Sequence, residues 1–171
     1  MTNKEASDIQ EKMVANYLDW KQVTGSGSRP THPGDVLGAE WMGECKTHTS
    51  PNHNVIFKKS VWDKICEEAY SHHKSPAYFV DDGSQKWYKT WVVFTARDLS
   101  QSKDQYTIID LQATIKDSFS FKRYPNDYIE LFASNHIIFQ FQFNTSYENL
   151  SSKRNKLFLT TLETFRDIIN I

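Results

Sequence analysis

The sequence predicts an α/β fold in which helices cover a central mixed β-sheet, with a C-terminal part that is rich in strands. Over residues 1–95, apolar stripes of helical spacing alternate with short apolar runs that turn residues bound. Beyond residue 95, YTIIDLQATI and HIIFQFQFNT alternate apolar and polar residues, which is typical of strands. No repeat or charge block divides the chain. We therefore expect a single domain over residues 1–171, with a core over 1–95 and a β-rich continuation over 96–171.

The first element is predicted to be an amphipathic helix, because Ile9, Met13 and Tyr17 recur at helical spacing. SDIQ has the form of a capping box, and Thr2 to Glu5 offers an earlier start. TGSGSRPTHPGD follows, with three glycines and two prolines in twelve residues, and is predicted to be a loop.

The middle of the chain is predicted to contain two strands over residues 35–47, an apolar run VIFKK, and then a helix whose start resembles SVWD. Lys64 and Glu68 are spaced to pair on the exposed side of that helix. AYFVDDG and KTWVVFTA follow as two further strands.

The chain is predicted to end in a strand, KLFLTT, and a helix that a capping box from Thr160 to Glu163 opens. The alternating segment HIIFQFQFNT places Ile137, Phe139, Phe141 and Phe143 on one face. Such a row could stack on bases, but its period predicts sheet core first.

The stretch GDVLGAEWMGECKTH carries the chemistry of interest. Glu44 and Lys46 share one face of a strand while Cys45 points to the other, toward the core. A hairpin would bring Asp35 to the same end as this pair. Two carboxylates and the backbone carbonyl of Cys45 suit Mg²⁺, and Lys46 could position or deprotonate a water beside the ion. Spacing alone also fits an exposed, solvated ion pair that contributes under about 1 kcal/mol.

These motifs together resemble the PD-(D/E)XK nuclease superfamily, and are most similar to archaeal-type Holliday junction resolvases and related small phage and bacterial nucleases. The resemblance covers about residues 5 to 95 and is carried by GSGS, GDV, ECK and IFKKSVWDKI. Gly34 stands where a proline often precedes the acid, and the C-terminal third has no counterpart in the motif. The resemblance implies a restriction-endonuclease-like fold.

The resemblance also implies roles for individual residues. Asp35 and Glu44 would bind metal, with Lys46 activating water, and Mg²⁺ or Mn²⁺ as the cofactor. A first-helix glutamate would reach the metal through water, for which Glu11 is the candidate and Glu5 and Gln10 are alternatives. The residues expected to contact DNA are Ser26, Ser28, Arg29, Lys58 and Lys59, while lysines on a solvated helix face are the default for Lys58, Lys59 and Lys64.

We therefore expect a magnesium-dependent endodeoxyribonuclease. A leaning toward branched DNA, such as the Holliday junctions of DNA recombination, and toward a homodimer comes from the resemblance alone. Two alternatives stay open: a non-cutting module of this fold that binds nucleic acid or protein, and a structural protein in which the three residues are surface charge.

The composition leaves these functions open. Net charge is −1 and the pI is about 6.6, which argues against a surface that is basic throughout. Mean hydropathy is −0.62, and a polar N-terminus carries no secretory pattern, so we expect a cytoplasmic protein without a membrane span. The two cysteines, Cys45 and Cys66, do not indicate a disulfide framework.

Overall fold

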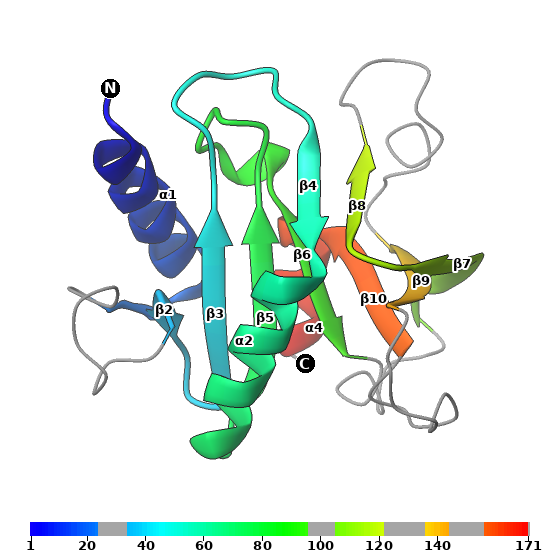
Figure 1. Ribbon diagram of the computed structural model, residues 1–171. Coiled ribbons are helices and arrows are strands. Elements are labelled where there is room, and N and C mark those ends of the chain that lie inside the picture. The colour runs from blue at the N-terminus through cyan, green and yellow to red at the C-terminus, as the bar shows by residue number, and fades with distance from the viewer. Residues whose placement is uncertain (24–33, 96–104, 122–135, 144–155, 171) are drawn as a thin grey trace.

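The computed structural model describes residues 1–23, 34–95, 105–121, 136–143 and 156–170 (Figure 1). Ser26, Ser28 and Arg29, which the sequence assigns to a DNA-contacting loop, lie outside these residues. The helices are α1 (Asn3–Leu18), α2 (Lys59–Ser71), α4 (Leu162–Ile169) and the short 3₁₀ helix η1 (Trp87–Lys89). The strands are β1 (Lys21–Gln22), β2 (Val36–Leu37), β3 (Trp41–Lys46), β4 (Val55–Lys58), β5 (Ser75–Val80), β6 (Trp91–Thr95), β7 (Thr107–Ile115), β8 (Ser118–Phe121), β9 (Ile137–Phe143) and β10 (Lys156–Thr161).

Eight of the described strands form one mixed sheet in the order β1-β2-β3-β5-β6-β10-β9-β7. β3 pairs with β5, and β7 with β9, in parallel, and the remaining neighbours are antiparallel. β4 and β8 form a separate antiparallel pair. The prediction of an α/β fold with a central mixed sheet is confirmed. β8 was not predicted, because its partner lies some sixty residues earlier and local patterning cannot reveal such a pairing.

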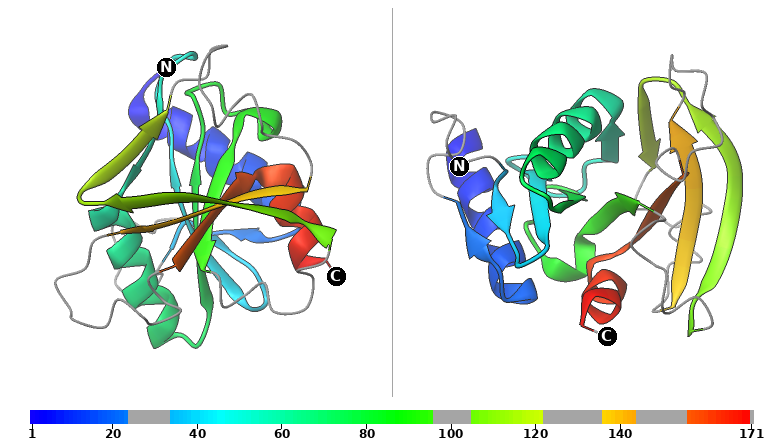
Figure 2. Two further views of the ribbon diagram at one scale, coloured as in Figure 1. Left: turned by 90° about the vertical axis from the view of Figure 1, so that its right-hand side faces the viewer. Right: turned by 90° about the horizontal axis from the view of Figure 1, so that it is seen from below.

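Helices lie on both faces of the sheet, as expected (Figure 2). α2 covers one face together with β4 and β8, and its core includes Phe57, Ile65 and Tyr78. α1 and α4 cover the other face, where Val14 and Phe165 pack with Phe79 of the sheet. Burial of these apolar side chains is the main force that holds the layers together.

β7, β9 and β10 continue the same sheet, since β10 pairs with β6, and β9 pairs with β10 and β7. Phe139, Phe141 and Phe143 are buried on one face of β9, with Ile137 packed against them. The interpretation of this alternating row as sheet core is confirmed.

α1 begins at Thr2, whose side chain accepts a hydrogen bond from the Glu5 amide while Glu5 bonds back to the Thr2 amide. The earlier of the two predicted starts is therefore the one used. The helix buries the face that contains Ala6, Gln10 and Val14, whereas Ile9 is 44% exposed. The predicted stripe of Ile9, Met13 and Tyr17 therefore lies beside the buried face and not on it. The alanines of the buried face allow the helix to approach the sheet closely.

Two helix starts differ from prediction by one or two residues. α2 follows Lys58, which provides no side-chain cap, so Ser60 lies inside the helix rather than at its cap. α4 is capped by Thr161, which accepts from the Thr164 amide, so Thr160 is not the cap. Thr160 is still part of β10, paired with Val92. Strand pairing therefore fixes where this helix can begin.

Candidate active site

Asp35 lies immediately before β2, at the edge of the hairpin that β2 and β3 form. Its amide donates to the Gly43 carbonyl at 2.8 Å, and its carboxylate accepts from the Cys45 amide at 2.9 Å. Since the amide and carbonyl of a strand residue point to the same edge, the Cys45 carbonyl also lies on the Asp35 side. The hairpin thus brings Asp35 to the end of β3, as the sequence predicted.

Glu44 and Lys46 extend from β3 toward the α2 face, while the Cys45 side chain lies in the core beneath α1. Glu44 is buried, at 7% exposure, and the Lys46 ammonium nitrogen is 2.7 Å from its carboxylate. The predicted alternation of faces is confirmed. The exposed-pair alternative does not describe Glu44, because its carboxylate is withdrawn from solvent.

The electrostatics of the cluster favour an added cation. Burial and the charge of Asp35 raise the pKa of Glu44, although Lys46 and Lys64 act in the opposite direction. Burial alone would lower the pKa of Lys46, but Glu44 and Asp35 raise it overall. The lysine is therefore charged at neutral pH, and the acids still repel one another.

The first-helix acid at this site is Glu11, which is half-buried on α1. Burial and then the charge of Asp35 raise its pKa to about 7, with Asp8 and Glu44 adding to the shift. Glu5 is exposed and belongs to the helix cap, so it does not join the cluster. Gln10 is fully buried and donates to the Lys46 carbonyl at 2.7 Å, which ties α1 to the end of β3.

Asp35, Glu44 and the Cys45 carbonyl provide the hard oxygen atoms that Mg²⁺ prefers, and a magnesium ion commonly retains several waters beside so few protein ligands. In the described part of the chain, no three histidine, cysteine, aspartate or glutamate side chains are arranged to hold one ion. The donor set available at this hairpin would be two carboxylates and a backbone oxygen. It fits magnesium better than zinc, which takes nitrogen and sulfur ligands.

Lys64 lies on α2, and Lys58 and Lys59 lie where that helix begins. Lys64, paired with Glu68 at 3.9 Å, is close enough for its charge to act on Glu44. Lys58 is exposed and its amide contacts the Tyr78 hydroxyl, whereas Lys59 is paired with Asp63. Of the two predicted DNA-contacting lysines, Lys58 is thus the one without a salt bridge among the described residues.

Tyr78 is a neighbour of the site that the sequence did not indicate. It lies on β5 opposite Glu44, and burial raises its pKa to about 12. In the chain, β3 and β5 are separated by the whole of α2, so no local spacing in the sequence indicates that Tyr78 lies opposite Glu44.

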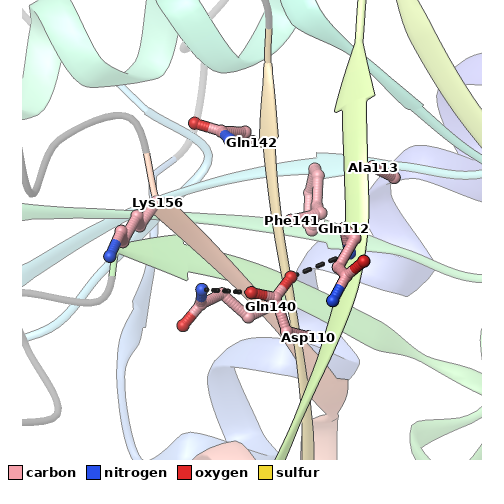
Figure 3. A pocket seen from close by; sticks show the side chains of 7 residues that line it. All are labelled: Asp110, Gln112, Ala113, Gln140, Phe141, Gln142 and Lys156. Atoms are coloured by element: carbon pink, nitrogen blue, oxygen red, sulfur yellow. Dashed lines mark hydrogen bonds between the residues drawn. The ribbon is translucent and has the colours of Figure 1, made fainter. Parts of the chain in front are cut away.

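A pocket of about 300 Å³ lies elsewhere, on the C-terminal strands (Figure 3). Asp110, Gln140 and Lys156 line it, and the Asp110 carboxylate accepts from the Gln140 side chain and the Gln112 amide. None of the residues predicted for catalysis or DNA contact lines it. This pocket is therefore separate from the acids and Lys46 of the candidate site.

Comparison of the chain with protein-family models, with curated proteins and with solved structures finds no match. The functional assignment therefore rests on the chain's own residues and geometry. Among the helices that the structure describes, none is long and apolar enough to cross a membrane.

Proposed function

We propose that the protein is a Mg²⁺-dependent endonuclease that hydrolyses DNA phosphodiester bonds. The observation that carries the proposal is the buried Glu44 carboxylate beside Asp35 at the end of a hairpin, with the Lys46 ammonium 2.7 Å from Glu44. Burying acids close together costs free energy, and groups held at such a cost are concentrated at functional sites.

Asp35, Glu44 and the Cys45 carbonyl would hold the magnesium ion, and Glu11 would reach it through water. When bound, the ion supplies Lewis-acid chemistry and lowers the pKa of a coordinated water. Burial and then the charge of Asp35 raise the pKa values of Glu11 and Glu44, and the positive charge of the ion would offset both effects. Mn²⁺ accepts similar oxygen ligands and would substitute.

Lys46 acts as a cation in this proposal. Because its pKa is raised, it carries a proton at neutral pH and cannot accept one from water. It would orient the attacking water and stabilise the negative charge that develops on the phosphate oxygens. Of the two roles that the sequence leaves open for Lys46, positioning is the better supported.

The order of elements supports placing the site on a restriction-endonuclease-like fold of the PD-(D/E)XK superfamily. A helix precedes the hairpin, the acid opens β2, Glu-x-Lys ends β3, and α2 crosses to β5, which is parallel to β3. Action on branched DNA and a homodimer remain expectations from the resemblance.

The test is cleavage of labelled duplex, flap and four-way-junction DNA with Mg²⁺, Mn²⁺ or EDTA. Metal-dependent cutting that Glu44→Gln and Lys46→Met abolish would support the proposal, and the preferred substrate would define the class. Binding without cutting would favour the accessory module. Neither binding nor cutting would leave the three residues as a structural cluster.

A further inference from the structure

Two histidines lie on the loop that follows β3, at the same end of the strand as Lys46. The rings of His48 and His53 stack with centroids 4.3 Å apart and planes 21° from parallel. His53 is exposed and His48 is partly exposed. The nuclease proposal as stated does not use them.

The loop that carries the histidines is fastened to the turn after β5. The Gln85 side-chain amide lies within hydrogen-bond distance of the Thr47 hydroxyl, the His48 carbonyl and the Gly83 carbonyl, at 2.7 to 2.9 Å. A Cβ on Gly83, where φ is +95°, would lie 1.9 Å from the Ser50 carbonyl oxygen. The two segments therefore touch backbone to backbone, and only glycine permits it.

Two further hydrogen bonds complete this fastening. The Thr47 hydroxyl donates to the Asp81 carboxylate, and the His53 amide donates to the Asp82 carbonyl at 2.9 Å. A loop held in this way presents its side chains in a fixed position, so a ligand would lose little entropy in ordering them.

The charges around the histidine rings are mostly positive. Lys58 and His53 each act on His48, and after the effect of burial they lower its pKa further. The nearest acids on the fastened turn, Asp81 and Asp82, are buried, and both accept hydrogen bonds from backbone amides of the turn. The exposed side of this loop is therefore suited to an anion.

A metal is a poorer fit to the histidine pair. One nitrogen of His53 already contacts the Ser50 hydroxyl at 3.0 Å, and no third ligand joins the pair among the described residues. Phosphate needs only hydrogen-bond donors, which the ring N–H groups provide, and positive charge, which the Lys58 ammonium provides.

We infer that His48, His53 and Lys58 form a second phosphate-binding position, which holds the DNA backbone beside the phosphate at Asp35 and Glu44, because the histidine loop continues directly from Lys46 at the end of β3. This inference rests on the proposed function, and it assigns a substrate contact that the acids and Lys46 do not provide. Phosphate contacts of this kind set the register of the strand rather than its sequence preference.

The experiment measures binding of DNA in which one phosphate at a time, around the cleavage site, is replaced by an uncharged methylphosphonate. It uses the full chain with Asp35→Asn to prevent cleavage, and compares it with the same protein carrying His48→Gln and His53→Gln. The matched control carries His72→Gln and His73→Gln at the C-terminal end of α2, which lies at the opposite end of the sheet from the loop (Figure 1).

The loop variant should bind unmodified DNA about tenfold more weakly, as expected for lost hydrogen bonds to a charged group. One methylphosphonate next to the cleavage site should weaken the parent about tenfold and the loop variant less than twofold. The control should behave as the parent. An unchanged thermal midpoint of the loop variant would exclude a folding defect. Shifts of the His48 and His53 ring nitrogens, in NMR spectra of the parent titrated with DNA, would show that the rings respond to DNA directly.

Equal DNA affinity of the loop variant and the control would overturn the inference while leaving the nuclease proposal intact. So would equal sensitivity of parent and loop variant to every methylphosphonate. Absence of DNA binding by the parent and by wild type would overturn both proposals together.

Discussion

The sheet has an N-terminal part (β1, β2, β3, β5 and β6) and a C-terminal part (β10, β9 and β7), called its two halves below. Each half places an acidic side chain near lysine and amide groups, but the two acids differ in burial and in their partners. In the C-terminal half, Asp110 is exposed, and its two oxygens accept from the Gln112 amide and the Gln140 side chain. In the N-terminal half, Glu44 is buried beside Asp35 with Lys46 as its ion-pair partner. Asp110 stabilises a local irregularity of β7, whereas Glu44 is repelled by the charge of Asp35, and a cation would relieve that repulsion. Electrostatic crowding marks the candidate site, and the pocket does not.

The largest difference between the halves should appear in catalysis. Glu44→Gln should reduce the rate of DNA cleavage about 10³-fold or more, because it removes both metal binding and the partner of Lys46. Asp110→Asn should stay within about twofold of wild type. Single-turnover cleavage with saturating Mg²⁺ measures both. Equal losses in the two variants would place the chemistry outside the crowded cluster.

A buried acid next to the histidine loop should give the next largest effect, on stability. Burial raises the pKa of Asp81 to about 6 from an ordinary 3.8, so folding disfavours its charged form. Ionisation of Asp81 should therefore cost the folded state up to about 3 kcal/mol, a contribution that is absent below about pH 4 and accrues as pH rises from there to about 6. Asp81→Asn should flatten this profile in urea unfolding between pH 4 and 8. A parallel profile for the variant would show that Asp81 ionises without cost.

Glu11 tests whether the crowding is relieved by metal. Its pKa of about 7 means that its charge destabilises the metal-free fold above that pH and not below about 4.5. Glu11→Gln should therefore raise the thermal midpoint at pH 8 more than at pH 5, while reducing cleavage about 10- to 100-fold. Mg²⁺ should raise the wild-type midpoint more at pH 8 than at pH 5.5. A Mg²⁺ response independent of pH would separate Glu11 from the metal.

The smallest effect is expected in the C-terminal half. Gln112 has φ of +50° at the irregularity between Asp110 and Thr114 in β7, a conformation that costs a residue with a Cβ about 1 kcal/mol. Gln112→Gly should change the free energy of unfolding by no more than about 1 kcal/mol, toward greater stability, and leave cleavage unchanged. Reduced activity in this variant would indicate that the two halves are coupled.

Local patterning predicted the hairpin, because Gly, Asp and the alternating ECK segment fix a tight pairing within a dozen residues. It also predicted the faces of Glu44, Cys45 and Lys46, since alternation along a strand is obligatory. For the first-helix residue that reaches the metal, local patterning left three candidates, Glu11, Glu5 and Gln10. It could not choose among them, because the choice depends on which face of the helix packs on the sheet. Gln10 occupies that face and places Glu11 at the cluster.

Contacts between segments distant in sequence were beyond prediction. The pairing of Tyr78 with Glu44 and the fastening of the His48 loop by Gln85 both depend on where β5 lies, which no spacing near residue 44 reveals. The β4–β8 pair has the same origin. The sequence assigned the same role, contact with DNA, to the neighbouring residues Lys58 and Lys59. In the described structure only Lys59 forms an ion pair, so the two lysines differ in a way that the sequence did not reveal.

The position of β10 has a consequence for the order in which the strands can join the sheet. This strand follows β7 and β9 in the chain, and it lies between β6 and β9 in the sheet. β9 and β7 are made earlier, yet they can join the N-terminal half only after β10 has been inserted between them and β6. Alternating segments such as IIFQFQF must therefore wait, with unpaired edges, until β10 has been synthesised. Residues 156–161 join β9 and β7 to the rest of the sheet, so their loss should release these two strands while sparing the pairing of β2, β3 and β5.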